Sequence, residues 1–146
     1  MKALSVRQPW AWLIVNGFKD VENRSWNTKH RGPVLIHASS RKPSPADMRE
    51  ALVVMQTVGC MSYRLPSADG FKLGGIVGVA TITGTCESST SPWFSGPVGF
   101  QLRDARPLKF RPMRGRLSFF DTPFRLHGKF NLLVPEGYRD MTEETL

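Results

Sequence analysis

The segment Gly75–Thr85 constrains the fold of this chain more than any other stretch of its sequence. It carries no charged residue and is rich in β-branched side chains, a composition typical of a strand in the middle of a sheet. Glycines interrupt the segment, and a glycine inside a strand often marks a bend or a close approach of another backbone. The segment therefore predicts a long, bent central strand around which the rest of the domain is built.

Shorter strands and two helices are predicted on either side of this segment. Pro9 suits the first turn of a helix that Gly17 ends, and Ser44 is a typical N-cap for a second helix that Gly59 ends. With the central strand there are about six strand candidates, so we expect an α+β fold that is mainly β: a small, highly curved β-barrel with two or more flanking helices. The shorter strand candidates are Lys2–Val6, Pro33–Ala38, Val98–Leu102, Leu117–Phe120 and Gly128–Leu133.

Length and composition place these elements in one domain. The 146 residues are 40% hydrophobic, which is typical of a chain with a single core. We expect this core within residues 1–135, followed by an acidic tail over residues 136–146. No apolar run approaches the roughly 20 residues that span a bilayer, and Arg7 comes too early for a signal peptide. We therefore expect a cytoplasmic protein without a membrane segment, and we assume a monomer.

Histidine and cysteine offer no metal site in this sequence. The chain has 3 histidines and 2 cysteines, and their positions do not match the ligand spacing of a zinc site. We therefore expect neither a metal nor a cofactor.

The charge of the chain favours a polyanionic partner. Twenty Lys and Arg against 12 Asp and Glu give a formal net charge of +8, and such an excess binds nucleic acid through the release of counterions. The excess is concentrated in residues 103–116, where prolines and a glycine exclude a basic amphipathic helix. We expect an RNA-contact patch that consists of Arg103, Arg106, Lys109, Arg111, Arg114 and Arg116.

A second polar cluster, formed by Lys19, Glu22 and Arg24, follows directly after the first predicted helix. A lysine shielded from water can have its pKa lowered enough to act as a base or nucleophile, while a neighbouring glutamate holds or relays a proton. Arg24 stays charged, and its planar guanidinium suits a phosphate or the edge of a base. On an ideal strand, however, Lys19 points away from the other two residues. Convergence requires a turn or bulge, and the alternative is a surface ion pair of little energy.

The pattern of this cluster, G-x-K-x-x-E-x-R over Gly17–Arg24, closely resembles the ASCH domain (activating signal cointegrator homology). Leu4–Ala11, Arg31–Ala38, Gly75–Gly78 and Gly96–Phe100 are similar to the family as well. The resemblance implies a PUA-like β-barrel in which the Gly17–Arg24 segment lines a cleft. It also implies RNA or nucleoside ligands, and some members are ribonucleases or amidohydrolases of acylated cytidine.

The chain departs from the amidohydrolase members at one position. Those members carry Lys-x-x-Thr with a second glutamate farther along, whereas this chain has Glu22 at the threonine position. Glu87, just after the central strand, is the acid that we nominate in place of the second glutamate. Whether the mechanism carries over therefore stays open at this point.

Aromatic side chains supply the expected surface for a base, because an aromatic face stacks on a base for roughly 1–3 kcal/mol. Trp10 and Trp26 flank the polar cluster in the sequence, although Trp10 on its short helix also suits the core. Trp93 lies in a loop, has less reason to be buried and is the stronger stacking candidate. Ser39 follows a strand and is a further candidate for lining the cleft, with an ordinary polar turn as the alternative.

Three functions are left open by the sequence. The first is binding of RNA or a modified nucleoside in a basic cleft, in which Arg24 and the RNA-contact patch bind phosphate. The second is an amidohydrolase that deacylates an N4-acylated cytidine, with Lys19 as base or nucleophile and Glu22 assisting. The third is a ribonuclease acting on single-stranded RNA, for which the sequence offers no carboxylate cluster to hold Mg²⁺.

Overall fold

The computed structural model describes residues 1–59, 64–128 and 132–139. Its helices are α1 (Trp10–Val15) and α2 (Pro45–Thr57). Its strands are β1 (Lys2–Val6), β2 (Val21–Arg24), β3 (Gly32–Ala38), β4 (Gly75–Cys86), β5 (Val98–Pro112), β6 (Phe119–Asp121), β7 (Phe124–His127) and β8 (Leu132–Pro135).

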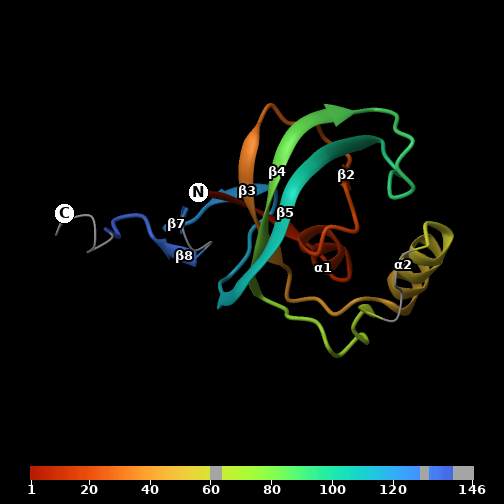
Figure 1. Ribbon diagram of the computed structural model, residues 1–146, viewed down its shortest axis with the longest axis horizontal. Coiled ribbons are helices and arrows are strands. Elements are labelled where there is room, and N and C mark those ends of the chain that lie inside the picture. Colours follow the sequence, from red (N-terminus) through yellow and green to blue (C-terminus); the bar gives the residue numbers. More distant parts are fainter. Residues whose placement is uncertain (60–63, 129–131, 140–146) are drawn as a thin grey trace.

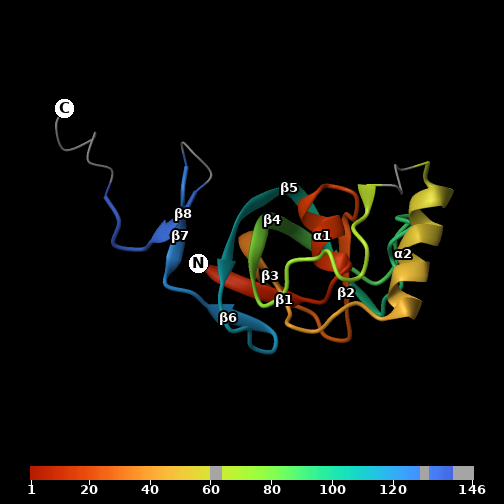
Figure 2. The ribbon, with the colours of Figure 1, turned by 90° about the horizontal axis from the view of Figure 1, so that it is seen from below.

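The main unit is a six-stranded sheet with the strand order β2-β5-β4-β3-β1-β6, and β7 pairs with β8 in a separate hairpin. The sheet curls into a half-barrel around α1 (Figure 1). Viewed from below, α2 lies on the side of the molecule opposite to β7 and β8 (Figure 2). The α+β, mainly β fold and the six curved strands are as the sequence predicts.

The central strand β4 bends where its glycines stand, and its pairing with β5 shifts register at three points. Gly78 shows why a side chain is excluded there: a Cβ at this position would lie 2.4 Å from Cγ1 of Val15 in α1. The absence of a side chain lets α1 pack directly against the concave face of the sheet. Gly17, with a φ of +81°, follows this helix and turns the chain towards β2, as predicted.

The second helix begins as the sequence predicts. The Ser44 hydroxyl accepts a hydrogen bond from the backbone N–H of Asp47 at 3.0 Å, which satisfies one of the free donors at the helix N-terminus. The helix buries Ala51 and Met55 against Leu13 of α1 and neighbouring residues. It is therefore held to the sheet by a narrow apolar contact beside α1.

Strand β5 is much longer than the predicted Val98–Leu102. It continues to Pro112, and Asp104 takes a positive φ of 51° where the register shifts. Only Val98–Gln101 pairs with β2, so the rest of β5 has β4 as its single neighbour in the sheet. Proline is tolerated on such an edge because its missing N–H is not needed by a second neighbour. The prolines of this segment therefore do not end the strand, which runs past the predicted Leu102 to Pro112.

The two edges of the half-barrel are bridged by aromatic side chains. Trp26, just after β2, packs edge to face against Phe119 of β6 and Phe100 of β5, with ring centroids 5.7 and 5.3 Å apart. On the outer edge, β6 is also held to β1 by an ion pair of 2.8 Å between Lys2 and Asp121. The Lys2 ammonium holds the pKa of the Asp121 carboxyl below its usual range. The half-barrel is thus closed by side chains rather than by a further strand pairing.

The C-terminal part differs from the single strand predicted over Gly128–Leu133. Two strands form a hairpin here, and Gly128 lies in the connection after the first of them, while residues 129–131 lie outside the described residues. The predicted strand was placed wrongly because Leu132–Val134 is a continuous apolar run that drew the prediction to one strand. Of the predicted acidic tail over residues 136–146, the structure describes only residues 136–139. Neither described helix has the length and apolar character needed to cross a membrane.

Candidate functional site

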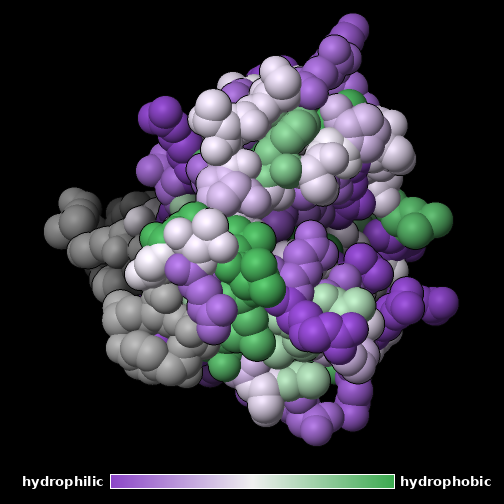
Figure 3. Space-filling model, turned by 90° about the vertical axis from the view of Figure 1, so that its right-hand side faces the viewer, coloured by the Kyte–Doolittle hydropathy of each residue, from purple (hydrophilic) through white to green (hydrophobic). Residues whose placement is uncertain are grey.

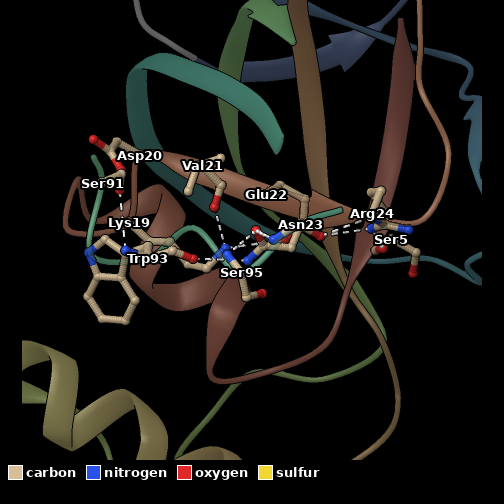
Figure 4. Close-up of polar contacts among 11 residues, drawn as sticks. Ser5, Lys19, Asp20, Val21, Glu22, Asn23, Arg24, Ser91, Trp93 and Ser95 are labelled. Atoms are coloured by element: carbon tan, nitrogen blue, oxygen red, sulfur yellow. Dashed lines mark hydrogen bonds and ion pairs between the residues drawn. The ribbon is translucent and has the colours of Figure 1, made fainter. Parts of the chain in front are cut away.

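Lys19, Glu22 and Arg24 converge at the start of β2. The backbone N–H of Lys19 donates to the carbonyl of Leu13 at 3.0 Å, so the chain turns back at the end of α1. Lys19 Nζ donates to the carbonyl of Val21 and lies 3.3 Å from Oε1 of Glu22. Oε2 of Glu22 accepts from Nε and Nη2 of Arg24 at 3.2 and 2.9 Å (Figure 4). The turn that convergence requires is present, and one carboxylate lies between two cations.

This polar network is buried rather than a surface ion pair. Lys19 is 4% exposed and Glu22 is 7% exposed. Removing one partner of a buried ion pair costs about 3–5 kcal/mol, because the other charge is left without compensation. Arg24 Nη2 also donates to the carbonyl of Ser5 at 2.7 Å and so ties β2 to β1. Arg24 therefore has a structural task that its predicted role in ligand binding did not include.

The network opens into a cleft of about 540 Å³, within the size range of ligand pockets, which we call the network cleft. One wall comes from α2, whose Glu50 and Val54 line it. The neighbouring Val53 is 61% exposed, and Figure 3, which looks onto this side, shows hydrophobic surface among hydrophilic residues. The cleft combines three cations with three carboxylates: Arg7, Lys19, Arg24, Glu22, Asp47 and Glu50.

Asn23 fixes the opposite wall, and sequence reasoning missed it. Its Nδ2 donates to the carbonyl of Trp93 at 3.0 Å, and its Oδ1 accepts from the backbone N–H groups of Ser95 and Gly96. These bonds hold the loop after β4 against β2 (Figure 4). The sequence did contain a signal for this role. Side chains alternate along a strand, so an asparagine between Glu22 and Arg24 must face the other side and is free to hold a neighbouring loop.

The three tryptophans nominated for base stacking all line the network cleft, but not equally. Trp93 is only 6% exposed and packs with Leu13, Val21 and Met55, so the expectation of an exposed loop residue is wrong. Trp10 is half-buried and meets the ring of Trp93 edge to face, with centroids 6.4 Å apart. Trp26 is half-buried in the aromatic bridge described above. Trp10 is thus better placed than Trp93 to offer a face to a ligand.

A second cavity of about 690 Å³ adjoins the first and shares Ser5, Arg7 and Arg24 with it. We call it the arginine cavity. The predicted site residue Ser39 lines this cavity and not the network cleft. Its other walls come from the end of β3, Gly74 and the segment Met113–Ser118 after β5.

The structure divides the expected basic patch. Arg114 and Arg116 line the arginine cavity, whereas the other four residues belong to β5 and line neither of these two cavities: Arg103, Arg106, Lys109 and Arg111. The alternation of the strand and its bulge at Asp104 spread the side chains, so they do not form one surface with the cleft. Glu87, which we nominated in place of the second glutamate of the amidohydrolase members, is exposed and lines neither cavity. It therefore does not lie in the cleft with Lys19. Within the described ranges, no group of three or more His, Cys, Asp or Glu is arranged to hold a metal ion.

A model of the ASCH domain matches residues 4–91, more than half of the chain and the whole of the buried network. The chain belongs to the ASCH domain family. It is similar to activating signal cointegrator 1 of Homo sapiens, with 57% identity over 47 residues, and to the protein of the same name from Mus musculus, with 53% over 47 residues. Each match covers 32% of this chain and 8% of the relative, so this ASCH domain corresponds to a small share of those proteins. The family match ends before β5, and so does not include the segment that carries Arg114 and Arg116.

Proposed function

We propose that this ASCH domain binds RNA or a modified nucleoside in the network cleft. The observation that carries the proposal is the buried network of Lys19, Glu22 and Arg24, which presents fixed polar atoms to a cleft with aromatic walls. Lys19 Nζ lies 5.9 Å from the ring centroid of Trp10, so a charged group and a stacking face adjoin. Unpaired bases are recognised by this combination, with hydrogen bonds to the base edge and stacking on its face.

The net positive charge of the chain favours RNA over a free nucleoside as the ligand. A free nucleoside has no phosphodiester chain, and the net charge of +8 would then have no partner. The exposed basic residues of β5 do not form one surface with the cleft, but they offer separate contacts for the phosphates of such a chain.

Titration of a short single-stranded RNA at two salt concentrations tests the proposal. Wild-type affinity should fall steeply with salt, since cations release counterions from RNA. Trp10→Leu should lower the affinity about tenfold at either salt, within the range of one stacked base. Trp12→Leu is the matched control, because Trp12 stacks on Phe18 and lines neither cavity. An affinity indifferent to salt and to Trp10→Leu would remove the proposal.

A second candidate activity, deacylation of an N4-acylated cytidine, is favoured by the buried contact of Lys19 with Glu22. Lys19 first passes a proton to Oε1 of Glu22, 3.3 Å away. The free amine then takes a proton from water, whose oxygen adds to the acyl carbon. The bond from the acyl carbon to N4 breaks as N4 receives that proton from Lys19, which yields cytidine and a carboxylic acid. Return of the first proton from Glu22 to Lys19 restores the ion pair.

Incubation with N4-acetylcytidine, followed by ultraviolet absorbance, tests this activity. Wild type and the control Glu87→Gln should turn over the substrate, and Lys19→Met should not; circular dichroism of Lys19→Met shows whether this variant is folded. Absence of turnover by wild type above the buffer rate would end the hydrolase candidate and leave the binding proposal standing. The RNA of the titration is also run on a gel, where cleavage would identify a ribonuclease.

A further inference from the structure

The arginine cavity has an unbalanced charge. Four arginines line it, and none of its described lining residues is an aspartate or glutamate. Two of the four, Arg7 and Arg24, are partly engaged: Arg7 lies 3.7 Å from Asp47, and Arg24 contacts Glu22. Among the described residues, Arg114 and Arg116 take part in no ion pair. Unpaired guanidinium groups around a hollow are a typical arrangement for binding phosphate, because their planar forks match its oxygens.

The segment that carries Arg114 and Arg116 is held firmly against the cavity floor. His37 Nε2 lies 2.6 Å from the carbonyl of Met113. A carbonyl only accepts, so Nε2 carries the hydrogen, and Nδ1 of this histidine lies within hydrogen-bond distance of the Ser5 hydroxyl at 2.9 Å. Gly115 packs so closely over this pair that a Cβ would lie 2.5 Å from Cε1 of His37. The two flanking arginines are therefore placed by a rigid support rather than by a free loop.

Ser39 adds an uncommitted donor to the same wall. Its hydroxyl is buried and has no hydrogen-bond partner within the described part of the chain. A buried hydroxyl is usually satisfied, so its free hydrogen-bonding capacity beside four arginines favours an anionic ligand.

The two cavities meet at Ser5, Arg7 and Arg24, so one ligand can occupy both. The network cleft has no excess positive charge for a phosphate, because its three cations are matched by three carboxylates, whereas the described lining of the arginine cavity has arginines and no carboxylate. A neutral base, in contrast, gains stacking only in the cleft.

We propose that the arginine cavity is a phosphate subsite, which holds a phosphate attached to the nucleoside whose base occupies the network cleft. This inference rests on the proposed function and narrows its ligand to a nucleotide, either a mononucleotide or a residue within an RNA chain. Arg114 and Arg116 supply the specific charge, and Arg24 contacts both parts of the ligand.

Binding of cytidine, its 5′- and 3′-monophosphates and tetracytidylate to wild type and two double variants tests the subsite. At least one monophosphate should bind wild type tenfold or more tightly than cytidine does. Arg114→Ala with Arg116→Ala should abolish that advantage and leave cytidine affinity unchanged. The control, Lys29→Ala with Arg31→Ala, removes the same charge from exposed residues that line neither cavity, and should retain the advantage. Tetracytidylate losing affinity in the first variant would extend the subsite to RNA.

Two results would overturn the subsite: a monophosphate advantage that survives Arg114→Ala with Arg116→Ala, or one that the control removes equally. Inorganic phosphate separates this test from the proposed function. Its titration, followed by amide NMR, should shift the signals of Ser39 and residues 114–118 even if no nucleoside binds. Unchanged amides at millimolar phosphate would reject the subsite, whereas shifted amides with no cytidine binding would reject only the base site.

Discussion

In the network cleft three cations face three carboxylates, whereas the described lining of the adjoining arginine cavity has four arginines and no carboxylate. In the cleft, the charges are used on one another: Glu22 is bonded to both Lys19 and Arg24, and all three positions are fixed. In the arginine cavity, fixed geometry comes instead from the hydrogen bond between His37 and the carbonyl of Met113 and from the close approach of Gly115. Arg7 and Arg24 are partly paired with carboxylates of the cleft, and the charges of Arg114 and Arg116 are left for a ligand.

The contrast separates charge that stabilises the fold from charge that can bind. A buried ion pair contributes little net stability when it forms, but removing one partner is costly. An exposed arginine can be removed with little effect on folding, because water has solvated it throughout. Measurements of stability and of phosphate binding should therefore rank the residues of the two cavities in opposite orders.

The largest expected effect is on the network cleft. Glu22→Gln keeps the shape of the side chain but leaves the ammonium of Lys19, which is 4% exposed, beside a neutral amide. The free energy of unfolding should fall by about 3 kcal/mol. Chemical denaturation of Glu22→Gln measures this loss, and Glu87→Gln, at an exposed position, should change the value by less than about 0.5 kcal/mol.

The same denaturation series applied to Arg116→Ala sharpens the comparison. This variant should stay within about 0.5 kcal/mol of wild type, because the residue is exposed. Equal losses in Glu22→Gln and Arg116→Ala would show that the charges of the two cavities do not differ in role.

The convergence of Lys19, Glu22 and Arg24 could be anticipated from the family resemblance but not from the spacing alone, because on an ideal strand Lys19 points away from the other two residues. The arginine cavity could not. It depends on the parallel pairing of β1 with β3, which places Ser5 beside His37, and on the path of the chain after β5. No local pattern in a sequence reports which strands become neighbours.

A second limit of prediction from sequence concerns residues of one chemical type that follow one another along the chain. The basic run over residues 103–116 predicted one patch, but strand alternation and the bulge at Asp104 divide it between an outer strand and a cavity. Trp93 shows the converse: it lies in a loop and is nevertheless buried, because Asn23 holds that loop against β2. Position in a loop does not predict exposure when the loop itself is anchored.

After Glu22→Gln, the next largest loss of stability is expected at Gly115, which supports the arginine cavity. Gly115→Ala places a methyl group where Cε1 of His37 and Oγ of Ser5 lie 2.5 and 2.9 Å away, so the segment must shift. We expect a loss of about 2 kcal/mol in the free energy of unfolding, as for an overpacked core position, together with the loss of phosphate binding. Gly128→Ala is the matched control, since a Cβ there meets nothing within 4 Å. Unchanged phosphate binding in Gly115→Ala would mean that the rigid support does not set the subsite.

The smallest effect should come from the basic residues that lie outside both cavities. Arg103→Ala with Lys109→Ala removes two exposed charges from β5. If single-stranded RNA follows this strand, the slope of log affinity against log salt should decrease by about 1.4, or 0.7 for each lost phosphate contact. Cytidine monophosphate should bind this variant as it binds wild type, because the ligand ends inside the two cavities. An unchanged slope would confine RNA contact to the cavities, and the charge of β5 would then serve only to keep the surface of the protein solvated.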